Sequence, residues 1–135
     1  MKSWFSMVLG LSLSFIVQAS EVNIPSYINS LETSRIGDYI FRFAVFSTES
    51  DFPCIRTELL DPSNNRALVD KLDICDFNGK SFSDGFAAVS FNNPRISNSA
   101  FEFELQLFAL RGPEEDNLNC SIDISGSKLG SLECH

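Results

Sequence analysis

The sequence predicts an all-β fold, a small antiparallel β-sandwich of immunoglobulin-like size in which two disulfides each close one hairpin. Three observations lead to this class. Apolar side chains recur at every second position in several segments, turn-forming residues separate these segments, and the four cysteines are symmetric about two of the turns. Seven or so short strands in about 115 residues are typical of a sandwich, with a small closed β-barrel as the runner-up.

The period of two is clearest in residues 100–110, where apolar side chains alternate with Glu102, Glu104 and a glutamine. This alternation predicts a long strand with one face on the core and one face in water. Residues 39–48 begin with a stretch to Phe46 that is apolar on both faces apart from Arg42, which predicts a central strand that is buried on both sides.

Two further segments have weaker strand signals. A third strand is predicted at Phe86–Phe91, ended by a turn at Asn92-Asn93-Pro94. Residues 22–36 are ambiguous, because their apolar residues have helical spacing whereas Gly37-Asp38 is a two-residue hairpin signal before a strong strand. We expect a strand near Leu31–Ile36, after a short helical turn.

The first cysteine pair lies symmetrically about a turn. Cys54 and Cys75 are equidistant from Asn64-Asn65, and asparagine favours tight turns. A hairpin folded there places the two cysteines opposite each other, with a loop wider than two residues because Asp61 and Pro62 precede it. The same register creates two opposite-charge pairs, which support it: Arg56 with Asp73, and Glu58 with Lys71.

The second cysteine pair behaves in the same way. Cys120 and Cys134 are symmetric about Ser127, and Ile122 would then face Leu132. We therefore predict the disulfides Cys54–Cys75 and Cys120–Cys134. A zinc site or a redox-active pair would need closely spaced cysteines such as C-x-x-C, and the sequence has none.

Residues 1–19 have the parts of a signal peptide. Lys2 supplies a positive charge, an apolar run extends to Val17, and small residues precede a cleavage site after Ala19, with a cut after Ser20 nearly as good. The run of about 14 residues is shorter than the roughly 20 that span a bilayer, although an N-terminal membrane anchor is the alternative. We expect residues 20–135 to form one soluble domain that is secreted or periplasmic.

The composition limits the partners. The net charge is −8, so the chain will not favour nucleic acid or anionic membrane surfaces, which repel it. A basic protein partner is the expected target. Solubility alone would explain the charge equally well.

Catalytic signals are weak. The only histidine is the last residue, His135, and a terminal side chain is poorly held for general-base chemistry. Glu102 and Glu104 lie on one face of a strand at a separation that glycosidases use, but the alternation of that strand explains them as its solvent face. We predict no enzyme activity and no cofactor.

A calcium site is the remaining chemical option. Acidic and amide side chains cluster in a predicted polar loop at residues 111–117, and Asp73, Asp76 and Asn78 form a second group. Neither stretch has the order of an EF-hand loop. We therefore predict a solvated acidic loop and no metal.

These absences favour a binding module, such as an inhibitor or immunity-type protein for a basic hydrolase or toxin. An alternative is a structural or adhesive subunit that assembles through strand edges, with residues 22–31 as the arm. A hydrolase that uses paired carboxylates is a distant third. The candidate partner-binding residues are acidic: Glu102, Glu104, Glu114, Glu115 and Asp116.

Overall fold

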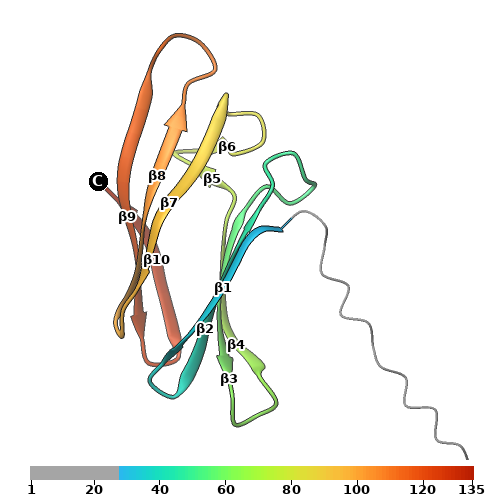
Figure 1. The fold of residues 1–135 in the computed structure, drawn as a ribbon, viewed down its shortest axis with the longest axis vertical. Coiled ribbons are helices and arrows are strands. Elements are labelled where there is room, and N and C mark those ends of the chain that lie inside the picture. Colours follow the sequence, from blue (N-terminus) through green and yellow to red (C-terminus); the bar gives the residue numbers. More distant parts are fainter. Residues whose placement is uncertain (1–27) are drawn as a thin grey trace, which may run out of the picture.

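The computed structural model describes residues 28–135, which form ten β-strands and no helix (Figure 1). The predicted all-β class is therefore confirmed. The predicted signal peptide, residues 1–19, lies outside the described residues. The strands are β1 (Ile28–Ile36), β2 (Tyr39–Phe46), β3 (Ile55–Asp61), β4 (Ala67–Ile74), β5 (Asp76–Phe77), β6 (Lys80–Ser81), β7 (Ala88–Ile96), β8 (Ala100–Phe108), β9 (Glu115–Ser125) and β10 (Lys128–Cys134).

The strands form two four-stranded antiparallel sheets, with the orders β1-β2-β3-β4 and β10-β9-β8-β7. Each sheet is a run of consecutive hairpins, so the chain completes one sheet before it begins the other. The small β5-β6 hairpin lies between them in sequence. The two sheets face each other in Figure 1, and no strand pairing joins them within residues 28–135, so the described chain is a sandwich and not a closed barrel.

The core lies between the sheets and is rich in phenylalanine. Phe41 and Phe101 are 0% and 2% exposed, and they come from opposite sheets. The ring centroid of Phe101 is 5.2 Å from that of Phe41, 4.7 Å from that of Phe43 and 5.3 Å from that of Phe103. The pairs of Phe101 with Phe41 and Phe43 join the two sheets at the centre of the sandwich.

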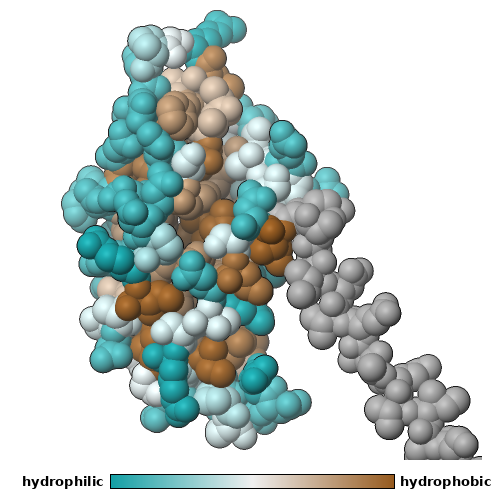
Figure 2. Space-filling model, viewed as in Figure 1, coloured by the Kyte–Doolittle hydropathy of each residue, from teal (hydrophilic) through white to brown (hydrophobic). Residues whose placement is uncertain are grey.

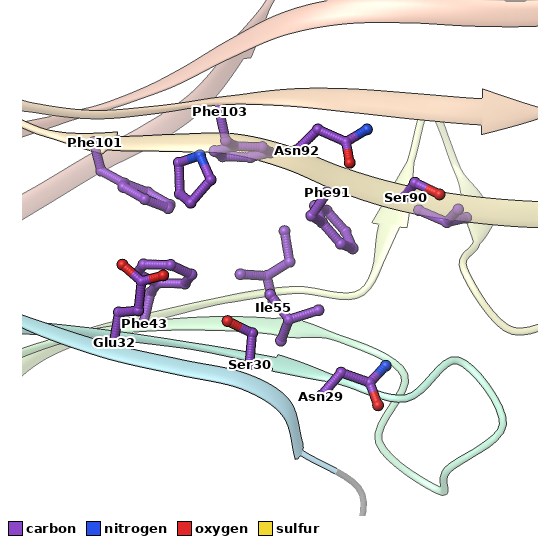
Figure 3. Close-up of a pocket in the computed structure, with 13 residues that line it drawn as sticks. Asn29, Ser30, Glu32, Phe43, Ile55, Ser90, Phe91, Asn92, Phe101 and Phe103 are labelled. Atoms are coloured by element: carbon purple, nitrogen blue, oxygen red, sulfur yellow. The ribbon is translucent and has the colours of Figure 1, made fainter.

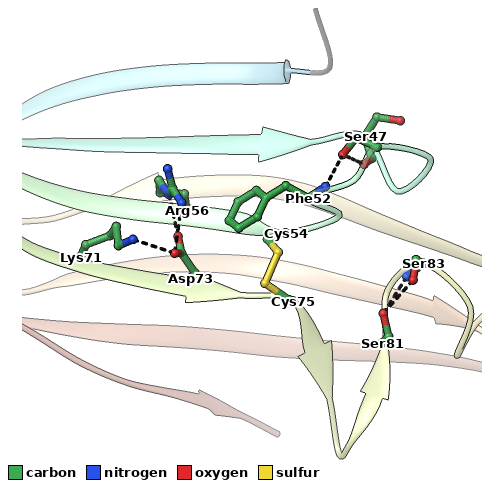
Figure 4. The surroundings of a disulfide bond; sticks show 10 residues. Ser47, Phe52, Cys54, Arg56, Lys71, Asp73, Cys75, Ser81 and Ser83 are labelled. Atoms are coloured by element: carbon green, nitrogen blue, oxygen red, sulfur yellow. Dashed lines mark hydrogen bonds and ion pairs between the residues drawn. A yellow bond between two sulfur atoms is a disulfide. The ribbon is translucent and has the colours of Figure 1, made fainter. Parts of the chain in front are cut away.

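The β3–β4 hairpin has the predicted register. Cys54 and Cys75 form a disulfide, and Arg56 pairs with Asp73 across the strands (Figure 4). The turn is wider than two residues, and Asn65 has a positive φ of 50°. Glu58 lies opposite Lys71 as predicted, but Glu58 forms its ion pair with Arg42 and Lys71 forms its ion pair with Asp73.

The β9–β10 hairpin confirms the second disulfide, Cys120–Cys134, and the pairing of Ile122 with Leu132. Its turn is centred between Gly126 and Ser127, half a position before the predicted centre at Ser127, because Ser125 pairs with Lys128. A register shift between Leu129 and Leu132 compensates, which explains why the cysteines still lie opposite each other.

Two predicted boundaries are wrong. The turn predicted at Asn92-Asn93-Pro94 is a bulge inside β7, because Asn92 pairs with Glu104 and Arg95 with Glu102. Asn93 has a φ of 52°, and proline is tolerated because β7 is an edge strand. The acidic loop predicted at residues 111–117 is shorter, because β9 begins at Glu115, which pairs with Phe108.

The ambiguous N-terminal segment is a strand throughout its described part. β1 starts at Ile28, earlier than the predicted Leu31, and pairs with β2 through the predicted turn at Gly37-Asp38. The helical turn expected before it falls on residues outside the described part. The structure of residues 28–135 contains no helix of membrane-spanning length and hydrophobicity.

Candidate binding groove

The two open sides of the sandwich differ. On one side the edge strands β4 and β10 are linked, since the backbone N–H of Leu129 donates a hydrogen bond of 2.9 Å to Oδ2 of Asp70. On the other side the edge strands β1 and β7 flank a groove of about 460 Å³ that reaches into the core. The sandwich is therefore closed along one seam and open along the other.

The groove has an apolar floor between two polar rims. Figure 3 shows the rings of Phe91, Phe101 and Phe103 above the polar side chains of β1, with Phe43 beside Glu32. On the face viewed in Figure 2, hydrophobic residues gather along the middle, between more hydrophilic flanks. The floor consists of Phe43, Val45, Ile55, Val89, Phe91, Phe101 and Phe103, and the rims consist of Asn29, Ser30, Glu32, Ser90, Asn92 and Pro94.

The β1 rim is polar because of its register. Ser30 and Glu32 pair with Val45 and Phe43, whose side chains face the core, so they lie on the inner face of the sheet. Leu31 lies on the outer face and is 48% exposed. The usual pattern of apolar-in and polar-out is thus reversed over the groove. This reversal kept the strand from being recognised by alternation in the sequence.

β1 is also the most regular of the four edge strands. Its pairing with β2 runs without interruption from Ser30 to Ile36, and its one register shift precedes Ser30. The other three edge strands, β4, β7 and β10, have a register shift within their length. Bulges and prolines hinder pairing with a further strand. The edge of β1 therefore offers the longest template for strand addition.

Glu102 and Glu104 lie away from the groove, on the outer face of the β7–β10 sheet. Nε of Arg95 is 3.7 Å from a carboxylate oxygen of Glu102, and the side-chain amide of Asn93 donates a 2.8 Å hydrogen bond to Glu104. Each carboxylate thus has its own neighbour, and nothing encloses the pair. The arrangement is that of a solvent-exposed strand face.

The acidic residues Glu114, Glu115 and Asp116 are exposed where β9 begins. Amide groups of Asn117 and Gln106 donate hydrogen bonds to Glu115, and these bonds lower the pKa of its carboxyl group. Within residues 28–135, no three His, Cys, Asp or Glu side chains are grouped so that they could hold a metal ion. In the second predicted group, which is Asp73, Asp76 and Asn78, Asp73 forms ion pairs with Arg56 and Lys71.

His135 is better ordered than a terminal residue was expected to be. Its backbone N–H donates a 3.0 Å hydrogen bond to the carbonyl of Asn119, and its carbonyl accepts one of 2.9 Å in return. The adjacent Cys120–Cys134 disulfide holds this end of β10. The imidazole is nevertheless exposed on the outer face, away from the groove.

None of the candidate partner-binding residues predicted from the sequence lines the groove. The groove was missed because its polar residues, Ser30 and Glu32, lie in the segment with the weakest pattern. A usable signal was present, since a strand that carries Ser30, Glu32 and Ser34 on one face cannot be covered by an apolar core along its whole length.

Comparison with known proteins gives no further guide to this groove. No protein-family model matches the chain, and no curated protein and no solved structure matches it with significant similarity.

Proposed function

We propose that this protein is an extracytoplasmic binding module that captures an extended segment of another protein along β1, in the groove between β1 and β7. The open seam is the observation that carries this proposal. A strand that pairs with β1 extends the β1–β4 sheet and covers the exposed part of the core. The regular pairing of β1 from Ser30 to Ile36 gives that strand about 20 Å of continuous template.

An extended peptide fits this groove better than a small apolar ligand does. A volume of about 460 Å³ suits either, but the groove is bordered by a strand edge whose N–H and C=O groups on that side have no strand partner within residues 28–135. A peptide backbone supplies donors and acceptors for those groups, whereas an apolar ligand does not. The edge therefore favours a polypeptide occupant.

The two disulfides and the acidic composition support the rest of the assignment. Disulfides that each close a hairpin are typical of proteins outside the cytoplasm. The net charge of −8 favours encounter with a basic protein. An inhibitor or immunity-type protein that occupies an exposed segment of a basic hydrolase or toxin would have these properties.

Selection from a library of displayed octapeptides against the oxidised protein tests the proposal. Ser30→Trp fills the groove from the inner face of β1, and Thr33→Trp is its matched control on the outer face of the same strand. We expect selected peptides to bind the wild type with a Kd near 1–100 μM. We expect Ser30→Trp to lower the affinity for these peptides by about tenfold or more, and Thr33→Trp to lower it by less than about twofold.

Two further measurements separate strand addition from simple side-chain binding. Amide chemical shifts should move in β1 and β7 on titration with a peptide, and remain unchanged in β4 and β10. Peptides N-methylated at alternate positions should lose affinity, because they cannot complete the ladder. Failure to select any peptide, or equal binding by the Ser30→Trp and Thr33→Trp proteins, would overturn the proposal.

A second candidate function is self-assembly through the same edge, as in a structural or adhesive subunit. The regular β1 edge also favours this function. The arm predicted at residues 22–31 is shorter, because residues 28–31 already pair with β2 as the start of β1, and residues 22–27 precede β1 directly in the chain. Sedimentation velocity distinguishes the two. Concentration-dependent oligomers that Ser30→Trp dissociates and Thr33→Trp preserves would favour self-assembly over capture of a foreign segment.

A further inference from the structure

We infer that the segment captured in this groove carries one basic side chain, Lys or Arg, directly opposite Glu32, with apolar side chains two positions before and after it. This inference rests on the proposed function and adds the chemistry of the partner. It follows from the position of the one charged side chain that residues 28–135 contribute to the groove.

Among the described residues that line the groove, Glu32 is the single charged one. Figure 3 shows its side chain extending from β1 into the space between the sheets, below Phe101. The ion pairs within residues 28–135 use Arg42, Arg56, Lys71 and Arg95 as cations, and none of them includes Glu32. The carboxylate is therefore available to a partner that enters the groove.

Strand geometry fixes where that partner's charge must lie. In an added antiparallel strand, the residue opposite Glu32 lies on the same inner face, with its Cβ about 4.5–5.5 Å from that of Glu32. The residues two positions away also face inward. There they meet the apolar floor of the groove, chiefly Phe91, Phe101 and Phe103. The resulting pattern is apolar, any residue, basic, any residue, apolar.

The β1–β4 sheet already uses this kind of pair. Glu58 forms an ion pair with Arg42, which lies directly opposite on β2, and Arg56 forms one with Asp73, which lies directly opposite on β4. Covering a lone Glu32 with an apolar strand would remove water from a charge without compensation, whereas a Lys or Arg compensates it. The groove thus selects against a purely apolar occupant.

The same argument disfavours the chain's own N-terminal segment as occupant. Residues 20–27 read Ser-Glu-Val-Asn-Ile-Pro-Ser-Tyr, with one acidic residue and no Lys or Arg. Placed along β1, this segment leaves Glu32 without a cation and contains a proline that cannot donate to the ladder. The charge of the groove therefore points to a foreign and basic segment.

The test uses the tightest-binding octapeptide from the displayed library. Its groove-facing Lys or Arg is replaced by norleucine or by glutamate, and each peptide is titrated by calorimetry against four proteins: the wild type, Glu32→Gln, Glu32→Lys and Glu102→Lys. Glu102→Lys is the matched control, since it makes the same change of charge on the outer face of the other sheet. It reports the effect of net charge alone.

We expect the library to be enriched in Lys or Arg at one groove-facing position. Norleucine in the peptide, or Glu32→Gln in the protein, should each weaken binding by about fivefold. The Glu32→Lys protein should bind the basic peptide more than tenfold less tightly than the wild type does, and it should bind the glutamate peptide more tightly. This exchange of preference would not follow from a structural role of Glu32.

The outcomes separate the two proposals. If no peptide is selected, the proposed function fails. If peptides bind in the groove without basic enrichment, or if Glu32→Lys and Glu102→Lys have equal effects, the proposed function stands and the inference about Glu32 is wrong. Self-association through the groove that Ser30→Trp abolishes would overturn the inference that the occupant is a foreign basic segment.

Discussion

Asp70 on β4 accepts a hydrogen bond from the backbone N–H of Leu129 on β10, and this contact links two strands that are 59 positions apart in the chain. Asp70 lies beside a register shift of β4, between the pairs Leu59–Asp70 and Leu60–Leu68. The bond closes one seam of the sandwich. The seam between β1 and β7 has no equivalent contact across its groove among the described residues.

Replacement of Asp70 by alanine should lower the free energy of unfolding by about 1 kcal/mol at neutral pH. One hydrogen bond to a carboxylate is lost, and the loss is at the low end because the group is partly exposed. Urea unfolding checks this value, with Asp84→Ala, an exposed aspartate in the loop before β7, as control. An unchanged midpoint for Asp70→Ala would show that the seam holds without this bond.

The acid stability of the protein should depend on Asp73. Burial alone would raise the pKa of this carboxyl group, but hydrogen bonds from Arg56 and Lys71, together with their charges, outweigh burial and lower it. A pKa that is lowered in the folded state adds stability above the unfolded value of about 3.9. That contribution is lost as the pH falls through the lower folded value.

Asp73→Asn should therefore cost about 1–2 kcal/mol at pH 7 and almost nothing in strong acid. Urea unfolding between pH 2 and pH 7 measures the difference between the two proteins. Asp76→Asn is the matched control, because Asp76 is exposed in β5 and follows Cys75 of the Cys54–Cys75 disulfide directly. A difference that is constant with pH would assign the cost to packing and not to charge.

The sequence predicted the sheets better than the groove, and the reason lies in what each depends on. The hairpin at Cys54 and Cys75 is specified by local symmetry and by charges that meet across two neighbouring strands. The groove depends on how two sheets that are made separately come together. No local pattern encodes that β4 and β10 close one seam while β1 and β7 leave the other open.

The misplaced turn has the same origin. Asn92-Asn93-Pro94 has the composition of a turn, yet pairing with β8 on both sides draws it into a bulge of β7. Glu102 and Glu104 lie on the exposed outer face that their alternation predicted, and their proposed part in partner binding stays a prediction. Glu32 was not a candidate, because the role proposed for it depends on the register of β1 against β2, which its own segment does not reveal.

Each disulfide should contribute substantially to stability. The bridges close loops with sequence separations of 21 and 14 residues, for which the chain-entropy estimate is about 3 kcal/mol each. The Cys54→Ala/Cys75→Ala and Cys120→Ala/Cys134→Ala double variants should each unfold at lower urea concentration. The loss from the first should exceed the loss from the second by only about 0.4 kcal/mol.

Removal of all four cysteines tests whether the two effects are independent. The hairpins lie in different sheets, so the losses should add to about 6 kcal/mol, which is a large part of the stability of a domain of this size. Circular dichroism should then show a largely unfolded chain at 37 °C. A folded four-alanine variant would mean that the phenylalanine core alone specifies the sandwich.

The acidic outer face should act on the rate of association, whereas Glu32 should act on the rate of dissociation. Glu102 and Glu104 are exposed and lie outside the groove, so a charge there changes the long-range field without changing bound contacts. The probe is the selected octapeptide fused to a basic carrier protein. Stopped-flow fluorescence at about 20 mM and 300 mM salt measures both rate constants.

We expect the Glu102→Lys/Glu104→Lys variant to bind several-fold more slowly at low salt and at nearly the wild-type rate at high salt, where the Debye length falls to about 6 Å. Its dissociation rate should stay unchanged. Glu32→Lys should instead dissociate faster at both salt concentrations, because its partner charge is covered in the groove. Equal association rates for the wild type and the double variant at low salt would remove the outer face from recognition and leave the groove as the whole interface.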